Sequence, residues 1–529
     1  NTLSNDFQAL NSHFDQMHKS VNGEIDQTAN KISEISVEIA KINETILHTQ
    51  GQNQAGQPND LLDKRNQLIS ELSQFTHVNT VEDTNGVLTV MIGQGTTLVA
   101  GITPLTVEVI AGDPDPLKTE LMLVSANSRV ALNGSTLGGS LAAGIEFRDE
   151  HLTQTRIEID RLAMAISSTL NESQASGLDL NALQGANVFT DINTTQLQQG
   201  RVLASSKNTG TTQAQVTIND VSKLPSDEFE IRFDGTDFTL YNLTNGNSEN
   251  LGTAGSGTPA GTHTPSSPDY GFSFSETGTP VAGDKFTIIP TKNSAALMKA
   301  TLTSGDAIAA SSAIDVTPSS HNVNDGKIEI THVSDPEAAR THNITVDVYQ
   351  TPSSSPATFD YRIYNSATPP PAASIATGTY ASGASVVVDI PAGTPDFQLK
   401  ISGDLFGSGA NARETFTLGD AFGVGNGNNA VAMAKTQEQG VTNGNKETFT
   451  QSLAITTSKA GSKASNAELV ADTAQALFTQ AFNRNQATSG VNLDEEAANL
   501  LKFQQAYQAA SQIISTANII FDTILSAVR

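Results

Sequence analysis

The sequence predicts an α+β multidomain protein. Both chain ends form a long helical coiled-coil bundle with a small β-hairpin region, and two all-β domains are inserted between them. Three observations predict this fold. Apolar residues near both ends recur at steps of three and four, which is typical of helices that bury one stripe. Between about 190 and 425, apolar runs are short and separated by Gly, Pro, Ser and Thr, which is typical of strands and turns. The length of 529 residues allows several domains.

The composition excludes several classes of protein. The formal net charge is −26, and binding to phosphates needs clustered Lys and Arg, so we expect no nucleic-acid partner. The sequence has no run of about 18 apolar residues, so we expect no membrane partner. Cys and Trp are both absent, which removes disulfides, thiol nucleophiles and Cys-ligated metals. We therefore expect no cofactor and no metal.

The first fifty residues predict one long helix. Apolar residues recur at steps of three and four from Leu3 to Val21 and again from Ile25 to Ile46. A single stripe with this spacing is the contact face of a coiled coil. We expect residues 3–46 to pack within the chain, most simply against the helices of the C-terminal end.

Two more helices and a hairpin region complete residues 1–190, which we expect to form the first part of the helical bundle domain. Helical spacing is present over 59–75 and returns over 141–169. Between them, over 78–132, the period falls to two. The pair Asn85-Gly86 lies there between β-prone runs and predicts a hairpin turn.

The central part of the chain predicts two related β domains, at 191–295 and 313–425, with a connecting helix at 296–312. Two short strings occur in both domains at the same offset of 130 residues. The equal offset favours a repeated β domain. The matching strings are Phe229–Arg232 with Phe359–Arg362, and Phe286–Ile288 with Phe416–Leu418.

After residue 425, helical spacing returns. We expect residues 426–489 to form the second part of the helical bundle domain and 490–529 to form a C-terminal axial helix. Asn492 and Glu495 are spaced as a capping box at its start. One apolar row, which we call the stripe, runs along this helix and is the predicted assembly interface. The stripe consists of Leu500, Phe503, Tyr507, Ala510, Ile514, Ala517, Phe521, Ile524 and Val528.

Three strings of residues resemble the flagellar hook-associated protein 1 family, the hook–filament junction proteins. The strings are Asn59–Leu68, Leu137–Leu141 with Phe147–Asp149, and Gly490–Leu500 continuing through Phe503–Ala509. The last string is specific for hook-associated and related axial proteins. The resemblance covers about 1–190 and 426–529, whereas the central β region resembles the family in kind only.

The resemblance implies an extracellular, structural and non-enzymatic adaptor that joins hook and filament by ring-like self-assembly of its helical ends. The implied partners are copies of itself in a ring, the hook protein, the second junction protein and an export chaperone that binds the C-terminal segment. The implied route is the flagellar type III system, without a cleaved signal peptide. The family's N-terminal segment is absent, and the chain starts at Asn1 without Met. We therefore expect an N-terminally truncated chain whose stripe packs between subunits.

Other functions stay open at this point. The chain could be another axial protein, such as the second junction protein or a flagellin-like protein. It could be a surface adhesin or ligand-binding module that uses its β domains. A secreted enzyme on an axial scaffold would need convergent His or carboxylate residues in a deep pocket, and the sequence indicates no such site.

Several short patterns resemble chemical motifs but are better explained as structure. The nine His are scattered and form no His-Glu-x-x-His zinc motif. Asp494, Glu495 and Glu496 fit the first turn of a helix, where the helix dipole favours negative charge. Gly134–Ser140 lacks the Lys of a phosphate loop, and Gly423–Gly427 lacks the spacing of a dinucleotide fingerprint. We expect both glycine-rich segments to be turns.

Overall fold

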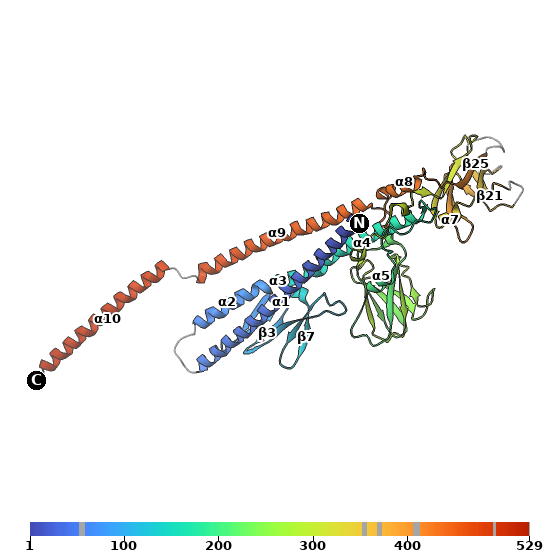
Figure 1. The fold of residues 1–529 in the computed structure, drawn as a ribbon. Coiled ribbons are helices and arrows are strands. Elements are labelled where there is room, and N and C mark those ends of the chain that lie inside the picture. Colours follow the sequence, from blue (N-terminus) through green and yellow to red (C-terminus); the bar gives the residue numbers. More distant parts are fainter. Residues whose placement is uncertain (52–58, 352–356, 368–372, 406–412, 490–492, 528–529) are drawn as a thin grey trace. The chain divides into compact units, whose positions relative to one another are not determined.

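The computed structural model describes residues 1–51, 59–351, 357–367, 373–405, 413–489 and 493–527 (Figure 1). These residues form two compact units, which we describe separately: residues 1–456 and residues 457–529. The first unit holds the N-terminal helices with their small sheets, two β domains, and the segments that connect them. The second unit is helical. The mixture of helix and sheet predicted from the sequence is confirmed.

The N-terminal helix buries the second half of its apolar row inside the first unit. Helix α1 (Thr2–Gly51) contacts α2 (Asn59–Phe75), and a common core also includes strands and the helix that follow them. Burial of large aliphatic side chains stabilises this packing by roughly 1.5–3 kcal/mol each. The buried isoleucines of α1 are Ile25, Ile32, Ile35, Ile39, Ile42 and Ile46.

The first half of α1 is divided between core and surface. Phe7 and Phe14 are buried in a second core with α4. Leu3, Leu10 and Met17, which alternate with them, are 37–43% exposed. The rest of the first unit therefore covers only part of the apolar row in this half of α1.

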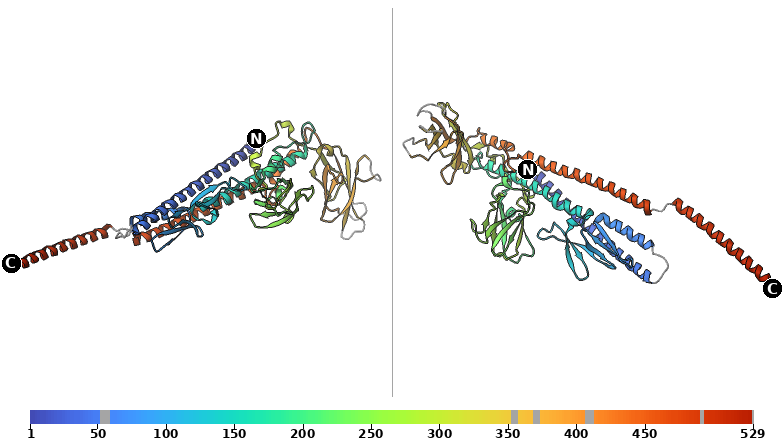
Figure 2. Two further views of the ribbon diagram at one scale, coloured as in Figure 1. Left: turned by 90° about the horizontal axis from the view of Figure 1, so that it is seen from below. Right: turned by 180° about the vertical axis from the view of Figure 1, so that it is seen from behind.

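Two small antiparallel sheets lie along one side of α1 (Figures 1 and 2). Their strand orders are β1-β2-β3-β4 and β5-β6-β7. The hairpin expected at Asn85-Gly86 is confirmed, because β1 pairs with β2 and Gly86 has a φ of 70°. The Asn43 side chain of α1 donates to the carbonyls of Leu88 and Gly101, both at 2.7 Å. The strands are β1 (Val78–Glu82), β2 (Leu88–Ile92), β3 (Thr96–Ala100), β4 (Thr103–Pro104), β5 (Thr106–Ile110), β6 (Glu120–Val124) and β7 (Arg129–Leu132).

The expected third long helix contains a π-helical segment that the sequence pattern did not indicate. After a short turn, η1 (Gly134–Thr136), helix α3 (Gly139–Glu146) continues through η2 (Phe147–Leu152) into α4 (Thr153–Ala175). Segment η2 is π-helical. Its buried Arg148 donates to the Asp149 carboxylate at 2.7 Å and to Asn22 Oδ1 of α1 at 3.0 Å. Arg148 thus ties the irregular turn to α1.

The first β domain follows helix α4, after β8 (Gly177–Leu178) and α5 (Thr195–Gly200). One sheet has the order β13-β12-β11-β16-β9 and the other β10-β15-β14. A core rich in phenylalanine lies in this domain, and Met164 of α4 completes it. The elements are β9 (Val202–Ala204), β10 (Gln213–Ile218), η3 (Val221–Lys223), β11 (Phe229–Phe233), β12 (Asp237–Asn242), β13 (Ser248–Thr253), β14 (Thr262–His263), β15 (Phe272–Thr277) and β16 (Lys285–Ile288).

The second β domain has a core of its own. Its sheets have the orders β18-β25-β20-β21-β22 and β19-β24-β23. The elements are β18 (Ile314–Pro318), β19 (Lys327–Val333), α7 (Pro336–Ala339), β20 (Ile344–Gln350), β21 (Thr358–Asn365), β22 (Ala376–Ala381), β23 (Ser385–Ile390), β24 (Phe397–Ser402) and β25 (Arg413–Asp420).

The two β domains have the same topology. Taken in chain order, β9 to β16 correspond one to one with β18 to β25, and both sheets then have the same strand order. The register agrees as well, since Ile231 pairs with Phe286 as Val346 pairs with Phe416. We infer that the two domains are related, as the sequence predicted.

The repeat predicted from the sequence is correct at one of its two matches. Phe286 and Phe416 lie at equivalent positions of β16 and β25. Phe229, however, lies on β11, whose equivalent is β20, whereas Phe359 lies on β21. The second match therefore pairs different strands, and its equal offset is a coincidence.

The connecting helix expected at 296–312 is not present. The chain there forms only α6 (Ser294–Leu297), the single turn η4 (Gly305–Ala307) and β17 (Ser311–Ser312), which pairs with β8. The backbone N–H of Thr301 donates to the Val188 carbonyl at 2.9 Å instead of to a helical turn. Residues that are distant in the chain hold this segment in an extended conformation. Such contacts cannot be read from the local sequence.

Helices return after the second β domain. Helix α8 (Asn428–Lys435) and η5 (Thr436–Glu438) belong to the first unit, α9 (Phe449–Ser489) begins there, and α10 (Leu493–Ala527) lies in the second. Helix α9 takes up most of the segment 426–489 that was expected to form the second part of the helical bundle domain. The described side chains of α9 from Thr457 onward and of α10 are exposed in the single chain. The coiled-coil bundle of both chain ends therefore stays a prediction.

Candidate assembly surface

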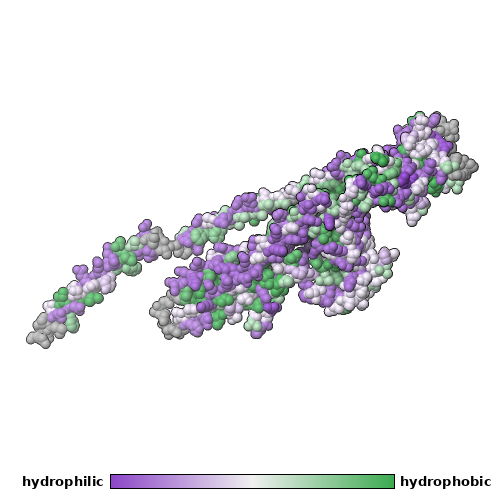
Figure 3. Space-filling model, viewed as in Figure 1, coloured by the Kyte–Doolittle hydropathy of each residue, from purple (hydrophilic) through white to green (hydrophobic). Residues whose placement is uncertain are grey.

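Helix α10 carries the predicted stripe on its surface, where Figure 3 shows apolar side chains. Asp494, Glu495 and Glu496 lie in the first turn of the helix, as expected. The expected cap Asn492 and the stripe residue Val528 lie outside the described residues. Ala510 and Ala517 are exposed. The large members of the stripe are 58–78% exposed, namely Leu500, Phe503, Tyr507, Ile514, Phe521 and Ile524.

An exposed stripe of this kind favours association. A large apolar side chain gains roughly 1.5–3 kcal/mol when it becomes fully buried. Contiguous exposed apolar surface on a protein marks an interaction site. Most of the stability of such a helix also comes from packing of its apolar face and not from helix propensity. The stripe therefore predicts a partner of matching apolar surface.

The sequence pattern underestimated the width of the apolar surface. Leu501, Ile513, Ile519 and Ile520 are also 54–69% exposed on α10. Ile513 and Ile520 are seven residues apart, so they lie on one face, and each directly precedes a stripe residue. A single row at steps of three and four does not include them. An arc wider than a coiled-coil seam would have been the signal to look for.

Helix α9 has a second exposed apolar surface. Leu469, Val470, Leu477, Phe478 and Phe482 are 50–65% exposed. The rings of Phe478 and Phe482 stack with their centroids 6.2 Å apart. Although α9 and α10 are long, no helix in the described part of the chain is apolar enough over a sufficient length to cross a membrane.

Helix α10 has few charges beyond its first turn. From Ala497 to Ala527 the charged residues are Lys502 and Asp522. Copies of this helix can therefore approach one another without strong repulsion between like charges. Low charge and a wide apolar arc together fit packing among identical helices.

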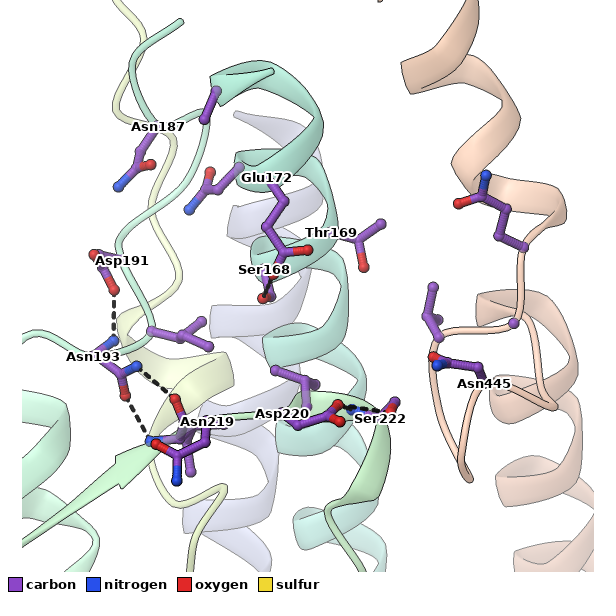
Figure 4. Close-up of a pocket in the computed structure, with 18 residues that line it drawn as sticks. Ser168, Thr169, Glu172, Asn187, Asp191, Asn193, Asn219, Asp220, Ser222 and Asn445 are labelled. Atoms are coloured by element: carbon purple, nitrogen blue, oxygen red, sulfur yellow. Dashed lines mark hydrogen bonds between the residues drawn. The ribbon is translucent and has the colours of Figure 1, made fainter. Parts of the chain in front are cut away.

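A polar pocket of about 640 Å³ lies in the first unit, between α4, the segments 187–193 and 218–222, and the loop 439–445 (Figure 4). Among the described residues that line it there is no His, Lys or Arg. Its three carboxylates each accept a hydrogen bond at 2.7 Å, Glu172 from Ser168 Oγ, Asp191 from the Asn193 N–H and Asp220 from Ser222 Oγ. Two of these hydrogen bonds come from serine hydroxyls, but each joins residues of one local turn, and the described lining holds no His, Lys or Arg that could complete a catalytic group. The pocket therefore gives no support to the enzyme alternative.

Two of the described histidines, His18 and His263, are buried. In the part of the chain that the structure covers, no group of three or more His, Cys, Asp or Glu side chains is placed to hold a metal ion. His18 of α1 is buried, and burial lowers its pKa, with Arg148 and Arg156 adding to the effect. His263 is buried beside Phe238, with Nδ1 3.0 Å from a backbone carbonyl oxygen.

The glycine-rich segments act as turns and close contacts. Gly138 and Gly139 have φ values of 72° and 65° at the start of α3. A Cβ on Gly139 would lie 2.4 Å from the carbonyl carbon of Phe75, so a side chain there would collide with backbone. At the other segment, the Asn426 N–H donates to the Gly423 carbonyl at 2.8 Å, which closes a turn.

Comparisons with known proteins match both ends of the chain. The family model described as the flagellar hook-associated protein FlgK helical domain matches residues 1–189, and that of the flagellar basal body rod FlgEFG protein C-terminal matches residues 485–527. The second match includes all of α10.

Whole-chain relatives agree with these matches. Flagellar hook-associated protein 1 of Escherichia coli (strain K12) is 23% identical, and that of Salmonella typhimurium is 24% identical, each over 99% of this chain and 74% of the relative. The structure of the flagellar hook junction protein FlgK from Burkholderia pseudomallei has the same fold, with a TM-score of 0.68 and 23% identity. That likeness covers 93% of this chain and 88% of the other.

The helical ends, the β domains between them and the exposed apolar helix define a structural component of the bacterial flagellum. More particularly, the family model, the whole-chain relatives and the shared fold together support the flagellar hook-associated protein 1 family. The resemblance seen in the sequence is thereby confirmed. As a flagellar axial protein, the chain interacts with other flagellar proteins.

Proposed function

We propose that this protein is an adaptor that joins hook and filament by ring-like self-assembly through α10. The observation that carries this proposal is the stripe, whose described large members are more than half exposed on a helix with few charges. Burial of the stripe among identical neighbours supplies the driving force. The β domains lie outside the helical ring and make lateral contacts that resist bending.

The partners follow from this role. The hook protein and the second junction protein are the neighbours on either side of the ring. An export chaperone covers the C-terminal segment before export, because an exposed stripe in the cytosol would associate too early. The protein leaves the cell through the flagellar type III system and acts outside it. It has no catalytic activity, no nucleic-acid partner and no membrane partner.

The proposal is tested by complementation of a strain that lacks the chromosomal copy. Phe503→Asp and Phe521→Asp place a charge in the stripe, and burying that charge in a ring is costly. We expect cells with hooks but without attached filaments, and filament subunits in the medium. Gln508→Asp, at an exposed position outside the stripe, is the matched control and should leave filaments attached.

The amount of each variant in the medium shows whether export has occurred. A stripe variant that is exported and still holds filaments would refute assembly through α10. Attached filaments in cells that lack the protein altogether would refute the junction role itself.

A further inference from the structure

The loop between β5 and β6 bridges two parts of the first unit. We call residues 112–119 the strap. We propose that the strap is a polar latch, which holds the first β domain against α1 and the π-helical segment, and whose release lets that domain move. The inference concerns the fold alone and does not depend on the proposed junction function.

The base of the strap is fixed to helices. Asn22 Nδ2 of α1 donates to the Leu117 carbonyl at 2.8 Å. Arg148 of η2 donates to Thr119 Oγ1 at 2.6 Å and to Asn22 Oδ1 at 3.0 Å. Arg148 is 2% exposed. A buried guanidinium with several hydrogen bonds is a rigid anchor, because its planar group fixes the direction of each donor.

The outer end of the strap holds the β domain. Lys118 Nζ lies 2.8 Å and 2.7 Å from the two carboxylate oxygens of Glu228. The Asp113 carboxylate accepts hydrogen bonds from Ser205 Oγ and from the Ser206 N–H, both at 2.7 Å. Charge-assisted hydrogen bonds of this kind are short and strongly directional. All of these contacts are polar.

A cleft of about 650 Å³ lies beside these contacts and is lined from both parts. Leu243 and Thr287 of the β domain line it on one side, and Asn133 and Ile145 line it on the other. The strap therefore lies along an open cleft between the two parts, which polar and apolar side chains both line. Interfaces between domains that are small and polar permit relative motion unless something locks them.

The first β domain has another contact that can act as a pivot. Met164 of α4 is part of the domain core, and Arg161 of α4 donates to the Leu224 carbonyl at 3.3 Å. Ser226 Oγ donates to Glu158 of α4 at 2.7 Å. These contacts stay in place when the strap is released, so the domain turns on α4 instead of detaching.

The strap depends on a glycine. A Cβ on Gly112 would lie 1.9 Å from the Lys118 carbonyl oxygen and 2.7 Å from that of Asp115. Gly112→Ala therefore forces the strap apart without removing any of its charged groups. This gives a second route to release besides the ion pair.

The test measures the distance between the two parts. The chain has no Cys, so Gln27→Cys on α1 and Asn247→Cys on the β domain can carry two spin labels, both at exposed positions. Double electron–electron resonance should give a narrow distribution of distances between the two labels in the otherwise unchanged full chain. Lys118→Glu and, separately, Gly112→Ala should lose that narrow distribution.

Two controls make the result decisive. Lys118→Glu combined with Glu228→Lys restores the opposite charges and should restore the narrow distribution. Lys223→Glu removes an ion pair with Asp269 inside the β domain, at 2.8 Å, and should leave the distribution narrow. A narrow distribution in both strap variants would overturn the proposal. Equal broadening in Lys223→Glu, or no recovery in the charge-swapped double variant, would overturn it as well. Circular dichroism of each variant confirms that the chain is folded.

Discussion

The carboxylate of Asp160 in α4 accepts a hydrogen bond from the backbone N–H of Ala295 in α6, at 2.7 Å. Asp160 is 2% exposed. Burial raises its pKa to about 7, and the hydrogen bond from Ala295 and the charges of Arg156 and Lys292 oppose that rise. The segment that returns from the first β domain is therefore tied to α4 through a carboxyl that titrates near neutral pH.

Asp160 should make the free energy of unfolding depend on pH. Its pKa in the folded state lies above the unfolded value of 3.8, so its stabilising contribution is complete below that value and is lost as the pH rises through about 7. Asp160→Asn keeps an oxygen acceptor and removes the titration. We expect the variant to gain stability relative to the parent as the pH rises from about 4 to about 7, by up to roughly 4 kcal/mol. Denaturant unfolding at several pH values measures this, and a constant difference between the two proteins would contradict it.

His18 should act in the opposite direction. Burial lowers its pKa below 6.5, and Arg148 and Arg156 lower it further, while Asp115 and Asp149 oppose them. The unfolded chain therefore binds a proton at a higher pH than the folded chain, so stability falls as the pH drops below about 6.5 and through the folded pKa. In the His18→Gln variant, stability should therefore fall less as the pH drops. Thermal unfolding at pH values below that point compares the two, with exposed His13→Gln as the control.

Gly177 is expected to be intolerant of any side chain. A Cβ there would lie 2.2 Å from Asn429 Nδ2 and 2.7 Å from the Ala309 carbonyl oxygen. Asn429 donates to that carbonyl at 2.7 Å and to the Ser173 carbonyl at 3.0 Å. The new methyl group would therefore displace Asn429 and disrupt these two hydrogen bonds. We expect Gly177→Ala to lower the free energy of unfolding by about 1–3 kcal/mol. Gly419→Ala, where a Cβ meets nothing within 4 Å, should change it little.

The second apolar row of α10 should contribute to assembly. Ile513 and Ile520 are exposed beside the stripe, so a ring that buries both rows needs more than one neighbouring helix. We expect Ile513→Asp and Ile520→Asp to reduce filament attachment in the complementation assay. Ser515→Asp, also exposed on α10, serves as the control. Normal attachment in both isoleucine variants would limit the interface to the stripe.

The sequence predicted those parts of the fold where one signal continues over many residues. The isoleucines from Ile25 to Ile46 and the residues from Leu500 to Ile524 each recur over several turns, and both runs are helical. The stripe was predicted residue by residue and is exposed where the structure describes it. Its role between subunits stays a prediction, because a single chain shows no neighbour.

The features that the sequence did not predict depend on tertiary contacts. Arg148 of the π-helical turn donates to Asn22, which lies far from it in the chain. The segment after Leu297 leaves helical conformation because Val188 and Gly177 lie beside it. The correspondence of the two β domains is visible in strand pairing, whereas loops of unequal length hide it from a comparison at constant offset.

The chain enters and leaves each β domain by neighbouring strands. Ile288 pairs with Val202 where the first domain begins and ends, and Asp420 pairs with Ile314 at the second. A module whose two ends lie side by side can be lost, gained or exchanged as one cassette while the helices outside it keep their places. Evolution can therefore change such a protein by whole modules, and an engineer can graft a foreign domain at the same two points.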